Sequence, residues 1–236
     1  NYGYHFVQWS DGNTENPRTI TVIQNATYTA QFSINSYAVS VSPNNSSRGT
    51  VSGSGSYTYN TVATISASAF YGYHFVQWSD GNTENPCSLV VMQDENYTAQ
   101  FDANNYLLTA NSTDVTLGNV TGGGTYEYNS LVAITANAIE HYHFVQWNDS
   151  ITDNPRTIVL TRDTTFTASF AIDKHSVATT SNNPTMGEAI GSGDFDYNSA
   201  TYISAEAFTG YHFVQWSDGA TANPRRIIVT QDTIFT

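Results

Sequence analysis

The side chains with the most versatile chemistry near neutral pH are the histidines, and four of the six share one sequence context. Each of the four lies in the string YHFVQW, at His5, His74, His143 and His212. A zinc site requires several nitrogen or sulfur ligands around one ion. These histidines are 69 residues apart and are flanked by aromatic residues. We therefore expect them to be structural and not to converge on a metal.

One local cluster imitates a metal site more closely. Glu140, His141 and His143 lie almost side by side in the sequence. The other copies of the string have glycine in place of His141. A metal function shared by all the copies is therefore not expected.

A further candidate is the turn formed by residues 80–85, DGNTEN, whose carboxylate and amide oxygens resemble calcium ligands. Calcium takes about six to eight oxygen ligands. The spacing is not that of an EF-hand, and the copy at residues 218–222 lacks the second acid. Asp, Gly and Asn also favour turns through their backbone conformations alone. We expect a turn that holds no cofactor, with calcium as the alternative.

Catalysis requires a nucleophile, a base and an oxyanion stabiliser in one pocket, or two carboxylates at a set separation. No such set stands out, and nearly every conspicuous residue occurs in three or four copies. The single cysteine, Cys87, can form no intramolecular disulfide. No base accompanies it in every copy, which argues against a nucleophile. We expect no catalytic residues and a protein that is not an enzyme.

Aromatic side chains are the other recurring chemical group, and they either fill a core or offer exposed faces to sugar rings. We expect one set to form the core of each repeat: Trp9, Trp78, Trp147, Trp216, Phe75, Phe144, Phe213, Phe32, Phe101 and Phe170. A second set follows a glycine-rich segment: Tyr57, Tyr59, Tyr126, Tyr128 and Tyr197, with Phe195 in the remaining place. These tyrosines form a possible ligand surface, or they pack within and between repeats.

Arginine recurs directly after a proline, at Arg18, Arg156 and Arg225. In one copy this position is Cys87. An arginine here either stacks on an aromatic ring or pairs with the acid of the turn. Because one copy lacks it, the contact is not essential.

The composition excludes some classes of partner. Seven Lys and Arg stand against 20 Asp and Glu, for a formal charge of −13, whereas binding nucleic acid needs clustered cations. With 39% hydrophobic and 14% aromatic residues, the chain can bury a core. It has no apolar run of about 18 residues and no leader, so we expect no membrane span, and a leader would lie upstream.

The whole chain repeats with a period of 69 residues, which carries Trp9 to Trp78 and onward. Such a period is too long for one coil of a solenoid and is near the lower size limit of an independent domain. We therefore divide the chain into residues 1–33, the second half of a repeat, then 36–102, 105–171 and 174–236, the last truncated at its end.

Within a repeat, apolar and polar residues alternate as in half-buried strands. Ile65, Ala67 and Ala69 point one way, and residues 97, 99 and 101 repeat the pattern. Residues 93–96 suggest a hairpin turn, and residues 37–41 and 49–59 suggest two more strands. We expect about six strands per repeat and no helix. The fold class is all-β, a tandem array of small domains, β-grasp-like or small β-sandwiches, arranged as beads in a row.

The segments GYHFVQWSDG, NPRTITV and YTAQF resemble the divergent InlB B-repeat domain, a repeat of the internalin type. The residues that carry the resemblance in one repeat are Tyr73, Phe75, Trp78, Asp80, Gly81, Pro86, Tyr97, Ala99 and Phe101. The resemblance covers essentially the whole chain. It implies a tandem module of bacterial surface or secreted proteins with a small β-fold and no chemistry of its own.

Three functional hypotheses follow. The first is a structural and adhesive segment, a stalk or adhesin module that is extracellular or on the cell surface and meets a protein or glycan of a host, a matrix or a neighbouring cell. The second is a glycan-binding array that uses the recurring aromatic residues. The third is a self-assembling extracellular filament whose subunits associate end to end.

Overall fold

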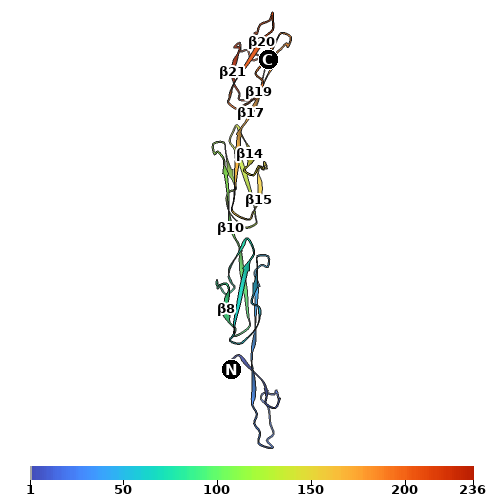
Figure 1. Cartoon of the computed structure of the whole chain (residues 1–236), viewed down its shortest axis with the longest axis vertical. Coiled ribbons are helices and arrows are strands. Elements are labelled where there is room, and N and C mark those ends of the chain that lie inside the picture. The colour runs from blue at the N-terminus through green and yellow to red at the C-terminus, as the bar shows by residue number, and fades with distance from the viewer. Residues whose placement is uncertain (1) are drawn as a thin grey trace. The chain divides into compact units, whose positions relative to one another are not determined.

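The computed structural model describes residues 2–236, and every regular element in that range is a β-strand, which confirms the all-β prediction (Figure 1). The first hairpin has β1 (Tyr4–Trp9) and β2 (Ala30–Ile34). The first repeat has β3 (Ser36–Pro43), β4 (Gly49–Ser52), β5 (Gly55–Thr58), β6 (Val62–Ala69), β7 (Tyr73–Trp78), β8 (Cys87–Val90) and β9 (Glu95–Ala103). The second has β10 (Asn105–Ser112), β11 (Gly118–Thr121), β12 (Gly124–Glu127), β13 (Ser130–Ala138), β14 (Tyr142–Trp147), β15 (Arg156–Leu160) and β16 (Thr164–Ile172). The third has β17 (Lys174–Thr179), β18 (Gly187–Ile190), β19 (Gly193–Asp196), β20 (Ala200–Ala207), β21 (Arg225–Ile228) and β22 (Thr233–Phe235).

By its internal contacts the chain divides into two compact units. The first takes in the residues up to Asn105 together with Glu127–Asn129, and the second takes Tyr106–Tyr126 and Ser130–Thr236. Residues 2–236 contain no helix of the length and apolar character needed to cross a membrane.

Each complete repeat is a sandwich of two sheets. In the first repeat a four-stranded sheet has the order β5-β3-β9-β7, and a three-stranded sheet has the order β4-β6-β8. The pair β3 and β9 is parallel, and the other neighbours are antiparallel. The second repeat has the same two orders, β12-β10-β16-β14 and β11-β13-β15. A β-grasp fold carries a helix across its sheet, and no helix occurs in the part of the chain described, so the sandwich is the form observed.

The core of a repeat lies between its two sheets. In the first repeat Val39, Ile65 and Trp78 are 0–1% exposed and belong to one buried cluster with Phe101. Val39 and Phe101 come from the four-stranded sheet, and Ile65 from the three-stranded one. The later repeats bury the same positions of the period: Leu108, Ile134, Trp147 and Phe170, then Val177, Ile203 and Trp216.

A β-bulge lets YHFVQW place two aromatic rings in this core. Phe75 and Trp78 are three residues apart, so in a regular strand they would face opposite sides of the sheet. In β7, Phe75 pairs with Phe101 but Gln77 pairs with Gln100, so one extra residue is inserted. The bulge turns the following side chains over, and the rings of Phe75 and Trp78 then lie 5.2 Å apart between centroids.

Two of the sequence-based expectations for strands were wrong. Residues 49–59, expected to be one strand, form β4 and β5, which belong to different sheets. The break is at Gly53, whose φ is +105°. Residues 93–96, expected to be a hairpin turn, comprise the end of the connection between β8 and β9 and the first two residues of β9, and these two strands also lie in different sheets. Alternating hydrophobicity shows which face of a strand is buried, but it does not show which strand is its neighbour. The first two repeats therefore have seven strands each where six were expected, and the third has six because residues 211–216 form no strand there.

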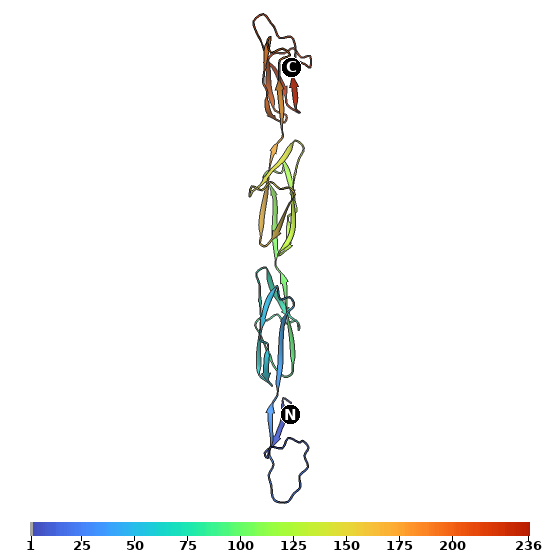
Figure 2. The same cartoon turned by 90° about the vertical axis from the view of Figure 1, so that its right-hand side faces the viewer.

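The first hairpin differs from the repeats because no second sheet covers it. Phe32, expected in a core, is 63% exposed. It contacts Phe6 edge to face at 6.0 Å, but the segment from Tyr4 to Ile34 forms only the two-stranded sheet β1-β2. The loop that joins these strands is the open segment at the blue end of the chain in Figure 2.

The crossing at Gly53 gives a test of the sandwich. An added Cβ would clash with Thr64 O and lie 2.8 Å from Ile65 Cα, both of them backbone atoms that cannot move aside. Gly81 also has a positive φ, +87°, but nothing lies within 4 Å of its Cβ position. We expect Gly81→Ala to cost about 1 kcal/mol of unfolding free energy from backbone strain, and Gly53→Ala at least about 2 kcal/mol. Equal urea midpoints for the two variants would contradict this packing.

Candidate functional site

The tryptophan of YHFVQW is buried in all three repeats. Trp78, Trp147 and Trp216 are 0–1% exposed. Each indole N–H donates to a carbonyl in the loop that follows: Glu84 O at 2.9 Å, Asp153 O at 2.9 Å and Ala222 O at 3.0 Å. A ring that is covered on both faces and whose donor is satisfied offers no platform to a sugar. In the first hairpin Trp9 makes the same bond, to Glu15 O at 2.9 Å, with its ring part-exposed.

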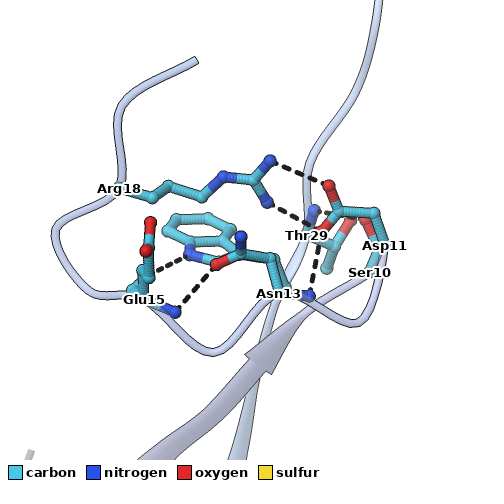
Figure 3. A network of polar contacts seen from close by, with 7 residues as sticks. Ser10, Asp11, Asn13, Glu15, Arg18 and Thr29 are labelled. Carbon is cyan, nitrogen blue, oxygen red and sulfur yellow. Dashed lines mark hydrogen bonds and ion pairs between the residues drawn. The ribbon is translucent and has the colours of Figure 1, made fainter.

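The acidic turn after the tryptophan binds its own backbone. Asp80 Oδ1 accepts a hydrogen bond from Asn82 N at 3.0 Å, and Asn82 Oδ1 accepts one from Glu84 N at 2.8 Å. Figure 3 shows the equivalent bonds in the first hairpin, where Asn13 Oδ1 accepts from Glu15 N at 2.8 Å. The oxygens that suggested calcium thus stabilise consecutive Asx turns. No group of three His, Cys, Asp or Glu residues that could hold a metal ion occurs among residues 2–236.

The recurring arginine makes both of the contacts considered for it. Arg18 Nη1 and Nη2 donate to the two carboxylate oxygens of Asp11 at 2.7 and 2.8 Å (Figure 3), and its guanidinium lies 4.6 Å from the centroid of the Tyr28 ring. The copies are Arg156 with Asp149 and Phe166, and Arg225 with Asp218 and Phe235.

These ion pairs lower the pKa of the turn aspartates. The hydrogen bond from arginine holds the pKa of Asp11 and that of Asp218 below the usual 3.8. At Asp149 partial burial raises the pKa, but the hydrogen bonds from Arg156 and from the backbone of Ile151 outweigh it, so the net pKa is also lowered. The ionised form of the turn is therefore the one that the folded state favours.

The first repeat lacks this pair because Cys87 replaces the arginine. The thiol is 5% exposed, and Asn82 Nδ2 donates to its sulfur at 3.2 Å. Burial, with the nearby charges of Asp80 and Glu84, raises the pKa of the Cys87 thiol. A thiol with a raised pKa remains protonated and is a weak nucleophile.

Asparagine before the recurring proline has a role that sequence reasoning missed. Asn85 Nδ2 donates to Ala67 O at 2.7 Å, and Asn85 Oδ1 accepts from Ala67 N at 2.9 Å. The side-chain amide thus pairs with β6 as a backbone peptide would. Asn154 and Asn223 make the same two bonds, to Ala136 and Ala205. The invariant Asn-Pro dipeptide in all four copies was the available signal.

The tyrosines proposed as a ligand surface are engaged within the protein. Tyr57 and Tyr126 are half-buried against their cores and donate their hydroxyl hydrogens to Gly53 O at 2.9 Å and Gly122 O at 3.0 Å. Phe195 takes the corresponding place at the third core.

The remaining tyrosines cover a loop of the preceding repeat. The Tyr59 ring lies so close to Gly3 that an added Cβ would be 2.6 Å from Tyr59 Cε1. Tyr128, which belongs to the first compact unit, covers Gly72 in the same way. In the second unit Tyr197 instead stacks on His141, with centroids 3.6 Å apart and an interplanar angle of 13°. His141 replaces the glycine and keeps its positive φ, at +69°.

A single linker residue connects each repeat to the next and is held from both sides. Asn35 N donates to Gly3 O at 2.8 Å, and Asn35 O accepts from Tyr59 N at 2.9 Å. The side chain of Asn35 is bonded to His5 Nδ1 at 2.7 Å. The same three bonds recur at Asn104, with Gly72, Tyr128 and His74, and at Asp173, with His141, Tyr197 and His143. We name these four-residue groups the junction clamps; they account for three of the four YHFVQW histidines.

The cluster that imitated a metal site is part of such a clamp. His143 bonds Asp173 at 2.8 Å, while His141 stacks on Tyr197 and its Nε2 lies 3.7 Å from Glu140 Oε1. The two histidines thus face different partners.

Sandwiches that repeat every 69 residues, with their conspicuous residues bound to one another, define the class of this chain as a tandem β-repeat protein. The chain belongs to the divergent InlB B-repeat domain family, whose model matches residues 1–36, 37–105, 106–174 and 177–236.

The comparisons with curated proteins and with solved structures add little to this assignment. Comparison with curated proteins yields no match. Among solved structures, "The Bacillus anthracis TIE protein" is 10% identical, with a TM-score of 0.38, over 88% of this chain and 52% of that one. The chain thus spans about half the length of that structure.

The arginine pair gives a pH-dependent test. Because the folded-state pKa of Asp149 is below its ordinary value of 3.8, the stabilisation is present above that pH and is lost as the pH falls through the folded pKa. We expect Arg156→Gln to lower the unfolding free energy by about 0.5–1 kcal/mol at pH 7, and by less at pH 3. Arg162→Gln, at an exposed arginine of the same repeat, is the control and should change little at either pH. If Arg156→Gln lowers the unfolding free energy by as much at pH 3 as at pH 7, the ion pair is excluded as the cause of the loss.

Proposed function

We propose that this chain is a non-catalytic structural segment of a bacterial cell-surface or secreted protein, a stalk that holds adhesive or other functional parts at a distance from the envelope. The observation that carries the proposal is the junction clamp. A linker of one residue whose N–H, C=O and side chain are all bonded has little freedom to bend, which is what a spacer needs and a flexible tether lacks.

The structural roles of the residues that were candidates for catalysis or binding support this function. The tryptophans fill cores, the turn acids bind backbone N–H groups and arginine, and the histidines hold linkers. The formal charge of −13 keeps such a chain soluble and discourages association between copies. The family to which the chain belongs is typical of bacterial surface proteins, which favours an extracellular or surface location.

The contacts favour a stalk over a glycan-binding array. An array of that kind needs aromatic faces open to solvent in each repeat. Trp78 and its two copies are fully buried, and Tyr59, Tyr128 and Tyr197 lie against loops of the protein itself. Adhesion by this segment would therefore use surfaces other than these rings.

Deleting one period tests the spacer directly. Removal of residues 105–173 joins Asn104 to Lys174 and leaves a linker residue, a YHFVQW histidine and a covering tyrosine in place. We expect the maximum dimension from small-angle scattering to fall by a fixed step, and to rise by the same step when residues 105–173 are duplicated. A dimension that does not follow the number of repeats would refute the stalk, and one that grows with protein concentration would support the end-to-end filament in its place.

The clamp itself can be loosened at one junction. Tyr197→Ala removes the ring that stacks on His141, and Tyr202→Ala, at a tyrosine of the same repeat that is 62% exposed, is the matched control. With spin labels on Val115 and Glu188 and with Cys87→Ser as background, we expect Tyr197→Ala to broaden the measured distance distribution. Tyr202→Ala should leave it unchanged, and equal widths in all samples would show that the ring does not restrain the linker.

A further inference from the structure

The first and last strands of each repeat are direct neighbours and run parallel. In the first repeat β3 pairs with β9 from Val39 opposite Glu95 to Pro43 opposite Ala99. In the second β10 pairs with β16 over residues 108–112 and 164–168, and in the third β17 pairs with β22 over residues 177–179 and 233–235. This is the parallel pair in each repeat, and the other strand pairs with a described register are antiparallel.

The geometry of this pair decides how a repeat responds to tension. The chain enters the first repeat at the N-terminal end of β3 and leaves it at the C-terminal end of β9. In a parallel pair these two points lie at opposite ends of the shared ladder. Pulling on the chain therefore slides β3 and β9 past each other along their length, and all the hydrogen bonds between them bear the load together.

An antiparallel neighbour would respond differently. Ser36 at the start of β3 lies directly opposite Thr58 at the end of β5. Tension applied between those two residues acts across the ladder at one end and opens its hydrogen bonds one at a time. Because each bond is individually weak, a ladder opened in sequence yields at much lower force than one loaded in parallel.

Side chains lengthen the parallel ladder beyond its backbone pairs. Asp94 Oδ1 accepts from Ala38 N at 2.8 Å, one residue before the first backbone pair. Asp163 accepts from Leu107 N at 2.8 Å, and Asp232 from Ser176 N at 2.9 Å, at the same places of the period. The N–H of Ser176, with a smaller effect of His175, lowers the pKa of Asp232, so this acceptor is charged.

The other end of the ladder is extended in the first repeat. Asn44 N donates to Ala99 O at 2.9 Å. The Asn44 side chain then donates to Phe101 O at 3.2 Å and accepts from Phe101 N at 3.1 Å. Asn44, the residue that follows β3, thus extends the pairing by two residues along β9, from Ala99 to Phe101.

We propose that the parallel pair of first and last strands is a load-bearing clamp, by which each repeat resists tension transmitted along the chain. The inference deepens the proposed stalk function and rests on it, because a stalk between an envelope and an attached partner is the part that carries the pull. Resistance of this kind is set by the rate of forced unfolding and not by equilibrium stability. It follows from the direction of the load relative to the ladder.

The test compares two pulling directions on the same folded repeat of the full chain. With Cys87→Ser as background, attachment at Ser36→Cys and Asn105→Cys loads the ladder of β3 and β9 lengthwise, whereas Ser36→Cys and Thr58→Cys peel β3 from β5. All three attachment residues are exposed. In optical-tweezers or atomic-force measurements we expect a several-fold higher rupture force for the lengthwise pull, with release of about 20 nm of chain. Equal forces in the two directions would overturn the proposal.

A second comparison examines the side-chain extension. Asp94→Ala removes the acceptor of the Ala38 N–H, and Ser66→Ala removes a side-chain bond of the other sheet, between Ser52 Oγ and Ser66 Oγ at 2.7 Å. For the lengthwise pull we expect a lower force with Asp94→Ala and no change with Ser66→Ala. Equal losses in both variants would show that general stability, and not the clamp, sets the force.

Failure of this proposal can be told apart from failure of the stalk. The force measurement does not depend on where the chain is anchored or how far it reaches. Equal forces would therefore overturn the load-bearing clamp and leave the proposed spacer function unaffected. A maximum dimension that does not change with the number of repeats would overturn the spacer function and leave the load-bearing clamp unaffected.

Discussion

The parallel hydrogen bonding between the first and last strands of a repeat is the constraint on which the rest of the architecture depends. It closes the four-stranded sheet at its centre, so that β3 and β9 carry the core residues Val39 and Phe101. It also sets where the chain leaves. An antiparallel closure would return the chain to the end of the repeat at which it entered, whereas a parallel closure lets it leave at the opposite end and continue directly into the next strand. With parallel closure, β9 ends at Ala103 and β10 begins at Asn105, so one residue suffices.

The side chains whose types could support catalysis or binding instead hold the backbone of the repeat in place. The Trp78 indole holds the loop that contains the acidic turn, that turn folds on its own side chains, and Asn85 ties the end of the loop to β6. Within this scheme the arginine contact is an addition. An ion pair at a partly exposed position contributes at most about 1 kcal/mol, which explains why the first repeat folds with Cys87 in its place.

Much of the fold could be predicted from the sequence because the period and the alternation are physical signals. The 69-residue spacing divides the chain, and the pattern around Ile65 identifies a strand with one buried face. The pairing partners of the strands could not be predicted. Polar and apolar residues alternate in β4 and β5 alike, although the chain crosses at Gly53 from one sheet to the other. The junction clamp could not be predicted from the sequence either. His5 and Asn35 are 30 positions apart, and no sequence periodicity indicates that a ring nitrogen and a side-chain amide at that separation are bonded. Phe32 was misplaced because a residue is buried only when a second sheet is present to cover it.

The one-residue linker has a consequence for inheritance. Every group in a junction clamp, from the glycine or histidine of the loop to the covering tyrosine, recurs at the same place of the 69-residue period. Unequal crossing-over between two copies of the YHFVQW-coding segment therefore adds or removes a whole period and regenerates a working junction at the site of exchange. Exchange between copies can thus change the number of repeats by whole periods, while every junction keeps the residues of its clamp.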